Sequence, residues 1–245
     1  MSARTVLKIT GEDRVDFLQN LVTNDVERLK DGLVWTALLT PQGKYLADFF
    51  LVPSGDAILI DVATALADGL QKRLTMYRLR AAVQIEATDT TVSRGLGTRS
   101  QGAFADPRHT ALGWRAYDGR PSQDVNWDEL RIKHMIPASG IELIPDESYP
   151  LEMNFEALNG VDFRKGCYVG QEVTARMKHK TELRKGLAQV TVTGTAAPGT
   201  AVVTDDGKAA GVLFTQSGGL GLAHLRFDRA TGTMTAGEAK LIAKM

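Results

Sequence analysis

Residues 33–52 read LVWTALLT, PQGK, YLADFFLV: two largely apolar runs joined by four residues that suit a turn. Pro41 fixes its own φ angle, and Gly43 tolerates a positive φ, so both favour a tight reversal of the chain. The two apolar runs are each long enough for a strand. This stretch therefore predicts a β-hairpin whose turn lies at residues 41–44.

The segments on either side of the hairpin alternate between helix and strand. Upstream, residues 15–29 carry apolar side chains at steps of three and four, which is typical of a helix with one buried face. The TND triplet at 23–25 lies inside that stretch, and we expect it to interrupt the helix. Downstream, 56–62 and 81–87 predict strands, and 63–77 predicts a second helix. This mixture predicts an α+β body.

The C-terminal part of the chain has a different pattern. From residue 187 onward, short apolar strands are separated by turns at Pro198–Gly199, Asp205–Gly207 and Gly218–Gly219. Such spacing is typical of a small antiparallel β-barrel. We therefore expect a boundary near residue 180, with an α+β body at 1–180, formed by two interleaved subdomains, and a barrel at 181–245.

The charge balance and residue composition of the chain limit the partners and the location expected for it. The 245 residues include 29 basic and 29 acidic side chains, so no overall field favours nucleic acid or an anionic membrane. No run approaches 18 apolar residues, and the N-terminus lacks the features of a signal or transit peptide. The sequence therefore predicts a cytoplasmic protein without a membrane partner. Its four histidines show no metal-binding spacing, and we expect no metal site.

The only cysteine, Cys167, lies in the segment RKGCYVGQEV. A lone cysteine is often just a small buried hydrophobe. Here Arg164 and Lys165 precede it and favour the thiolate form, while Gly166 and Gly170 leave room for another molecule to approach the backbone. So polar a segment is also a poor core strand. The pattern favours a reactive or ligand-facing thiol.

A basic run, RMKHKTELRK, follows at 176–185. It is explained either as a solvated surface or as an anion site for a charged ligand tail or for RNA phosphate. No RNA-recognition aromatic pattern accompanies it, so nucleic acid is an unlikely partner.

Residues 165–172, KGCYVGQE, resemble the signature octapeptide of YgfZ-type folate-binding proteins, which support iron–sulfur proteins. The resemblance extends through GEDRVDFLQNLVTNDV, TPQGKYLAD, DPRHTALGWR, ELRIKHMIP and YPLEMNFE, in order along essentially the whole chain. YgfZ-type proteins are similar in fold to the aminomethyltransferase (T-protein) of the glycine cleavage system. The resemblance thus implies an aminomethyltransferase-like body that binds folate in a central hole among three subdomains, the last a β-barrel.

The resemblance also implies site residues and partners. Cys167 is the expected functional thiol, with Lys165 beside it as the second catalytic candidate. Tetrahydrofolate or a derivative is the expected ligand, and iron–sulfur client or assembly proteins are the expected partners. The residues expected to contact folate are Asn24, Asp25, Glu152 and Asn154 for the pterin, Arg176 or Lys178 for the glutamate tail, and Tyr168, Gln171 and Glu172 from the octapeptide.

Two departures separate this chain from the T-proteins. T-proteins usually carry paired aspartates after the glycine turn, whereas here Ala47 precedes Asp48, so one carboxylate is missing. T-proteins also do not require the cysteine. The leading hypothesis is therefore a folate-binding accessory factor for iron–sulfur proteins. A folate-dependent one-carbon transferase and an RNA-associated protein are the alternatives, and whether the chain is an enzyme is left open.

Overall fold

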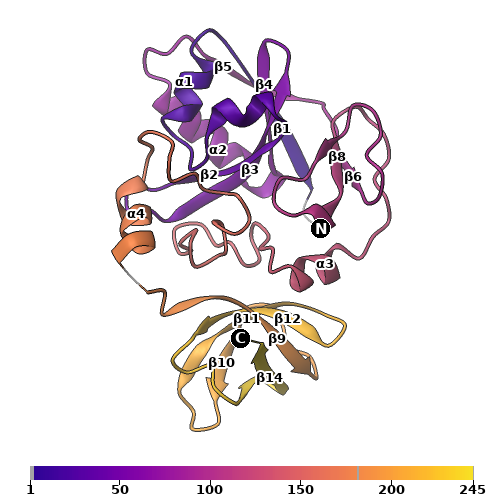
Figure 1. The fold of residues 1–245 in the computed structure, drawn as a ribbon, viewed down its shortest axis with the longest axis vertical. Coiled ribbons are helices and arrows are strands. Elements are labelled where there is room, and N and C mark those ends of the chain that lie inside the picture. The colour runs from indigo at the N-terminus through magenta and orange to yellow at the C-terminus, as the bar shows by residue number, and fades with distance from the viewer. Residues whose placement is uncertain (1–2, 181, 245) are drawn as a thin grey trace.

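A computed structural model describes residues 3–180 and 182–244 of the chain. It contains a five-stranded sheet, a three-stranded sheet and a closed barrel (Figure 1). The predicted α+β class with a C-terminal antiparallel barrel is therefore confirmed. No helix in the described parts of the chain is long and apolar enough to cross a membrane.

The five-stranded sheet is antiparallel and has the order β2-β3-β4-β1-β5. Its strands are β1 (Arg4–Thr10), β2 (Val34–Leu39), β3 (Tyr45–Ser54), β4 (Ala57–Ala63) and β5 (Gln84–Thr88). The predicted hairpin is confirmed as β2 and β3, which pair from Val34 opposite Leu51 to Leu39 opposite Tyr45. A register shift between Leu38 and Leu39 adjusts the pairing just before the turn.

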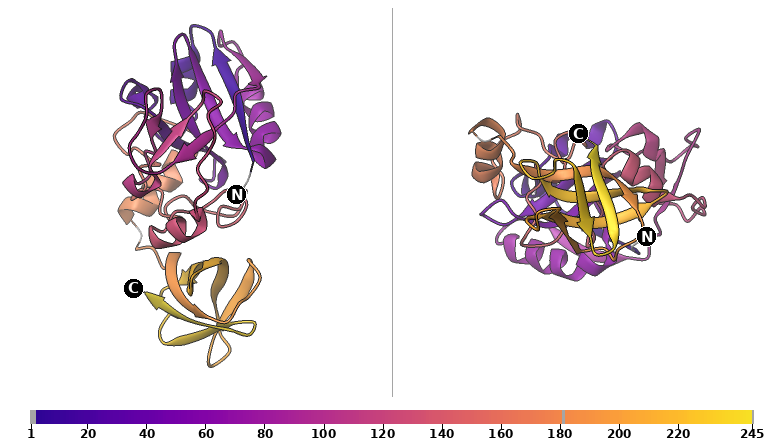
Figure 2. Two further views of the ribbon diagram at one scale, coloured as in Figure 1. Left: turned by 90° about the vertical axis from the view of Figure 1, so that its right-hand side faces the viewer. Right: turned by 90° about the horizontal axis from the view of Figure 1, so that it is seen from below.

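Alternation along β3 gives the sheet two different faces. Ala47 and Phe49 pack into the cluster that also holds Leu70 and Leu74 of helix α2 (Thr64–Tyr77), and we call this the helix face. The opposite side, which carries Trp35 and Phe50, is here called the inner face. Figure 2 shows α2 on one side of the sheet. On the other side lies the segment between β5 and the barrel, residues 89–184, which we call the middle segment.

The predicted helix at residues 15–29 is divided in two. Helix α1 (Arg14–Gln19) ends before the TND triplet, and a 3-10 helix, η1 (Val26–Lys30), follows it. The Asp25 carboxylate accepts the Glu27 backbone N–H at 3.1 Å and so caps η1. The expected interruption by the triplet is therefore confirmed.

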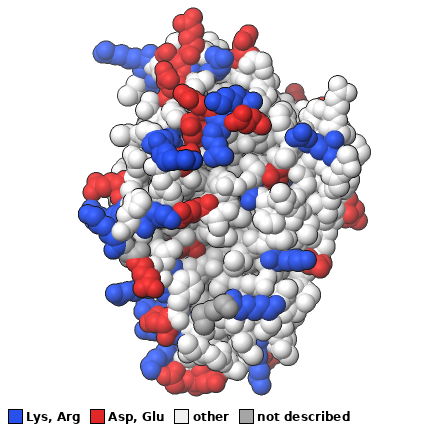
Figure 3. Space-filling view, in the orientation of Figure 1, with Lys and Arg blue, Asp and Glu red and all other residues white. Residues whose placement is uncertain are grey.

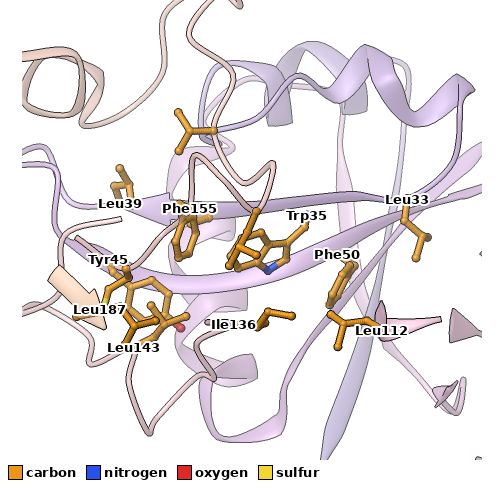
Figure 4. Close-up of a cluster of buried hydrophobic side chains, with 14 of the residues drawn as sticks. Leu33, Trp35, Leu39, Tyr45, Phe50, Leu112, Ile136, Leu143, Phe155 and Leu187 are labelled. Atoms are coloured by element: carbon orange, nitrogen blue, oxygen red, sulfur yellow. The ribbon is translucent and has the colours of Figure 1, made fainter. Parts of the chain in front are cut away.

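The middle segment covers the inner face. It contains a sheet with the order β6-β8-β7, formed by β6 (Ser93–Gly95), β7 (Phe104–Ala105) and β8 (Trp114–Ala116). It also contains η2 (Thr110–Leu112), α3 (Trp127–Lys133) and, after a long stretch of turns, α4 (Gln171–Lys180). Figure 4 shows its Leu112, Ile136 and Phe155 meeting Trp35 and Phe50 of the sheet in one apolar core.

The barrel has six antiparallel strands in the closed order β10-β11-β12-β9-β14-β13. They are β9 (Lys185–Thr193), β10 (Thr200–Thr204), β11 (Ala209–Ser217), β12 (Leu220–Arg226), β13 (Thr233–Ala236) and β14 (Ala239–Lys244). Strand β13 was not expected from the sequence. The first barrel strand begins at Lys185, while the division of the chain at 180/181 stays a prediction.

Buried polar contacts join the barrel to the body. The Leu187 backbone N–H donates to the Glu152 carbonyl at 2.7 Å, and the Gln189 side chain donates to the Ile132 carbonyl at 2.8 Å. Arg131 of α3 donates to the Thr215 hydroxyl of β11 at 2.8 Å. The barrel is thus attached to the same middle segment that covers the inner face.

Candidate functional site

The thiol of Cys167 is exposed on the loop that leads into α4. The Asp162 carboxylate shapes this loop, because one of its oxygens accepts the backbone N–H groups of Arg164 at 2.7 Å and Lys165 at 3.2 Å. After this turn Lys165 is buried, whereas Gly166 and Cys167 face solvent. The thiol is therefore reachable, as the sequence suggested, and its functional role stays a prediction.

Lys165 anchors the loop to the TND segment. Its ammonium group donates to the backbone carbonyls of Gln19 at 2.6 Å, Val22 at 2.5 Å and Asn24 at 3.1 Å. Burial lowers the pKa of Lys165 to about 8, against the opposing effect of the nearby Asp25 carboxylate. Because the ammonium group is used on three carbonyls, this geometry favours an anchoring role over the predicted role beside the thiol.

Asn24 is a buried junction between chain segments. Its amide nitrogen donates to the carbonyls of Trp35 at 2.8 Å and Asn159 at 2.7 Å, and its side-chain oxygen accepts the Asp25 N–H at 2.9 Å. Both of its donor hydrogens are therefore used within the protein. The structure places Asn24 as a support of the TND segment instead of a group free to read a pterin.

Glu152 and Asn154, the other two residues predicted to contact the pterin, make their contacts outside the TND segment. The Glu152 carboxylate meets two barrel side chains, His224 at 3.1 Å and Lys185 at 3.5 Å, and so belongs to the joint between body and barrel. Asn154 has a left-handed backbone, with φ at 65°, and its amide donates to the Met135 carbonyl at 3.2 Å. Each of the four residues predicted to contact the pterin therefore makes polar contacts within the protein: Asn24, Asp25, Glu152 and Asn154.

The surface of α4 carries charges that are largely compensated. Arg176 pairs with Glu172 at 2.9 Å, and Lys178 pairs with Glu156. Figure 3 shows blue and red side chains mixed along the edge of the molecule where α4 lies. Gln171 begins the helix, its backbone N–H donating to the carbonyl of Tyr168. The two cations predicted to bind a glutamate tail therefore already have carboxylate partners.

Asp48 of strand β3 is a buried carboxylate on the inner face. It accepts hydrogen bonds from the Tyr45 hydroxyl at 2.8 Å, the Ser139 hydroxyl at 2.6 Å and the Trp35 indole N–H at 3.0 Å. Ala47 lies on the helix face, among apolar side chains. A carboxylate at position 47 would therefore face away from the inner core, so its absence says nothing about chemistry on the inner face.

A buried network of ions also lies on the inner face, and the sequence did not predict it. Asp61 of β4 accepts hydrogen bonds from Arg4 at 2.6 Å, Arg115 at 2.5 Å and the Tyr117 hydroxyl at 3.0 Å. Burial acts to raise the pKa of Asp61, but Arg115 and Arg4 hold it below its usual value. Asp106 pairs with Arg108 at 2.8 Å. Only the segment DPRHTALGWR, noted for its family resemblance, pointed to this region.

Two hollows lie on another part of the molecule. One, of about 540 Å³, is lined by residues 10–12 and 78–84, and the other, of about 410 Å³, adjoins it at residues 54–57. None of the residues predicted to bind folate lines either hollow. Fully buried side chains such as Trp35 and Phe155, whose rings lie 4.2 Å apart, form the core at the inner face, and the expected folate site in a central hole stays a prediction.

Comparison with known proteins gives four similarities. Residues 184–245 match the family model of the CAF17 C-terminal β-barrel domain. The mitochondrial iron–sulfur cluster assembly factor IBA57 of Mus musculus is 28% identical, over 99% of this chain and 82% of the relative. Its Homo sapiens counterpart is 28% identical, over 96% of this chain and 78% of the relative. The solved aminomethyltransferase T of the glycine cleavage system from Bartonella henselae has a TM-score of 0.75 at 13% identity, covering 99% of this chain and 82% of that one.

These similarities bear on two predictions. The resemblance to iron–sulfur assembly factors with an aminomethyltransferase-like fold is confirmed. The predicted cytoplasmic location is contradicted, because the relatives that match along the chain are named as mitochondrial proteins. That prediction relied on the absence of recognisable targeting features near residue 1, which is weak ground for assigning a compartment.

Proposed function

We propose that this chain, related along nearly its whole length to iron–sulfur cluster assembly factors, supports the assembly or repair of iron–sulfur proteins through the thiol of Cys167. The observation that carries the proposal is the exposure of this thiol on a loop whose base is held by Lys165 and Asp162. An exposed group on a fixed loop suits contact with another protein, because little conformational freedom is lost when the partner binds.

The thiol suits this role chemically. A thiolate is a soft ligand for iron and a nucleophile toward disulfides or persulfides. Iron–sulfur clusters are commonly held by four cysteine thiolates, and this chain has one cysteine. A cluster handled by this protein would therefore be cargo that takes its other ligands from a client or an assembly partner.

Binding of tetrahydrofolate is the second part of the proposal. The likeness in fold to aminomethyltransferase T supports it. The chemistry of the inner face fits in part, since aromatic rings and arginines there suit a flat, anionic ligand: Arg108 lies 4.8 Å from the Phe50 ring centroid and 5.7 Å from that of Trp35. Asn24 and Glu152 fit less well, because internal contacts already use their polar groups.

The experiment that tests the thiol compares cells that depend on the wild-type chain, on Cys167→Ala or on Cys167→Ser. We expect both variants to fold and to accumulate, yet to lose activity in iron–sulfur enzymes, most visibly under oxidative stress. Gly69→Ala in helix α2 is the control, because the position lies outside the thiol loop and a Cβ at Gly69 meets no atom within 4 Å. Full complementation by Cys167→Ala would remove the thiol from the proposed function.

The folate part has its own test. Titration with tetrahydrofolate should raise the melting temperature of the wild-type protein through binding to the folded state. The absence of a shift at millimolar folate, with or without a polyglutamate tail, would contradict folate binding while leaving the thiol proposal in place.

Folate-dependent one-carbon transfer is the second candidate, and the carboxylate of Asp48 on the inner face is the observation that favours it. A transfer assay with a lipoylated carrier protein separates the two functions. Binding of folate without transfer supports the accessory role, and turnover that requires Asp48 but not Cys167 supports the transferase.

A further inference from the structure

A cluster of arginines lies between the inner face and the middle segment, and it holds more positive than negative charge. Asp61 and Asp106 are its carboxylates, and both are almost completely buried. Its arginines are Arg4, Arg94, Arg108 and Arg115. The cluster therefore has two positive charges in excess.

The two carboxylates form ion pairs with three of the arginines. Asp61 binds Arg4 through one oxygen, and Arg115 through the other. Asp106 holds Arg108 in a two-point contact, at 3.0 and 2.8 Å, and lies 3.8 Å from Arg115. Within residues 3–180 and 182–244, the geometry leaves no carboxylate within 4 Å of Arg94.

Arg94 is thus the uncompensated cation of the cluster. Its Nη2 atom is buried and has no hydrogen-bond partner among the described residues. Its guanidinium lies 3.9 Å from the ring centroid of Trp127, which fixes the plane of the group. Burial, together with the neighbouring Arg115 and Arg108, lowers the pKa of Arg94 to about 9. A partly buried cation without a carboxylate partner is costly, so this position favours an anion.

We propose that Arg94, stacked on Trp127 and backed by Arg108 and Arg115, is a binding site for an oxyanion group, either a carboxylate or a phosphate, carried by a ligand. A planar guanidinium presents parallel N–H donors that match both groups, and the site would supply the missing negative charge. Arg94 as a whole is only partly buried, so part of its side chain remains in contact with solvent. This site does not depend on Cys167, although it shares Arg108 with the inner face on which folate binding is proposed.

The test uses the full-length protein and small anions as probes. Melting temperatures are measured in sodium phosphate and in sodium glutarate, each against sodium chloride at equal ionic strength. Binding to the folded state should raise the melting temperature by roughly 5–10 °C when the effective anion is about a hundredfold above its Kd. A phosphate-only response indicates a phosphorylated ligand, and a glutarate response indicates a carboxylate-bearing one.

Two variants locate the effect. Arg94→Gln should abolish the anion-dependent rise, and Arg94→Lys, which keeps the charge but loses the planar donors, should weaken it. Arg120→Gln is the matched control, because Arg120 also lies over an indole ring, 5.8 Å from Trp114, but is paired with Asp118 and donates to the Gln101 carbonyl. It should keep the full response.

The proposal is overturned if neither anion raises the melting temperature above chloride, or if Arg94→Gln and Arg94→Lys respond like the wild type. Should Arg94→Gln fail to fold, the comparison of Arg94→Lys with Arg120→Gln decides alone. An equal response of those two proteins would then place the anion elsewhere.

Discussion

Gly170 and Gly43 pack backbone against backbone, so that a Cβ built on Gly170 would lie 3.1 Å from the Gly43 Cα. The contact joins the hairpin turn at 41–44 to the start of α4, although the two glycines are far apart in sequence. A Cβ on Gly43 would in turn lie 2.9 Å from the Val173 Cβ. The first residues of α4 are therefore fixed on the hairpin, directly after the loop that carries Cys167.

This contact predicts that Gly170→Ala is destabilising by about 1–3 kcal/mol. The substitution would force a side chain into a left-handed backbone, with φ at +84°, and place its Cβ 2.6 Å from the Thr40 carbonyl oxygen. Urea denaturation measures the loss. Gly166→Ala, in the same octapeptide but in open space, should change the free energy of unfolding by no more than about 0.5 kcal/mol. Equal stability of the two variants would contradict the packing argument.

The anchoring role of Lys165 predicts a stability defect. Lys165→Met keeps the length and apolar stem of the side chain but leaves the three carbonyls that accept from Nζ without their donor. We expect a loss of about 1.5–3 kcal/mol, the range for hydrogen bonds to a charged group. The control is Arg164→Met, which removes an exposed neighbouring cation. If the two variants unfold at the same urea concentration, Lys165 is not an anchor.

The low pKa of Lys165 predicts a pH dependence of known sign. Burial lowers the pKa to about 8 in the folded chain, whereas the unfolded chain keeps the ordinary, higher value of a lysine. Above pH 8 the unfolded state thus holds more protons on this group, and the free energy of unfolding rises with pH until the ordinary value is reached. Wild type minus Lys165→Met, measured in urea from pH 7 to pH 10, should show this rise. A flat difference would mean that the three carbonyls keep the group charged throughout.

Local patterns predicted much of the fold. Pro41 and Gly43 marked the hairpin turn, and the Pro-Gly and Gly-Gly turns marked the barrel, because turn chemistry depends on a few adjacent residues. Strand β13 (Thr233–Ala236) was missed, since four residues carry little periodicity. Helix α3 ends at Lys133, and two residues later Met135 takes a positive φ of 50°.

The site was less predictable, because its contacts join residues distant in sequence. Lys165 stands next to Cys167 along the chain, and this adjacency suggested that its charge acts on the thiol. In the structure its ammonium group reaches carbonyls more than 140 residues away. Arg94 belongs to no sequence motif. Its lack of a carboxylate partner is visible only in the structure, where Asp61 and Asp106 pair with other arginines.

The two faces of β3 predict opposite results at neighbouring positions. Ala47→Asp places a carboxylate among the apolar side chains of the helix face, and we expect a loss on the order of 3–5 kcal/mol without any gain of transfer activity. Asp48→Asn keeps the shape but replaces one acceptor oxygen by a donor facing Tyr45, Ser139 and Trp35, with an expected loss of about 1–3 kcal/mol. Denaturation and the carrier-protein assay measure both. A stable Ala47→Asp protein with transfer activity would contradict this assignment of faces.

The exposure of Cys167 predicts that the folded protein is alkylated completely by iodoacetamide. Since Gly166 and Cys167 face solvent while Lys165 and Tyr168 are buried, the reagent needs no opening of the loop. Cys167→Ala should therefore alter the free energy of unfolding by no more than about 0.5 kcal/mol, because an exposed small side chain replaces another. Mass spectrometry of the native protein, with and without urea, gives the extent of labelling. Labelling that requires urea would show a protected thiol, and the proposed contact with an iron–sulfur client would then need a prior opening of the loop.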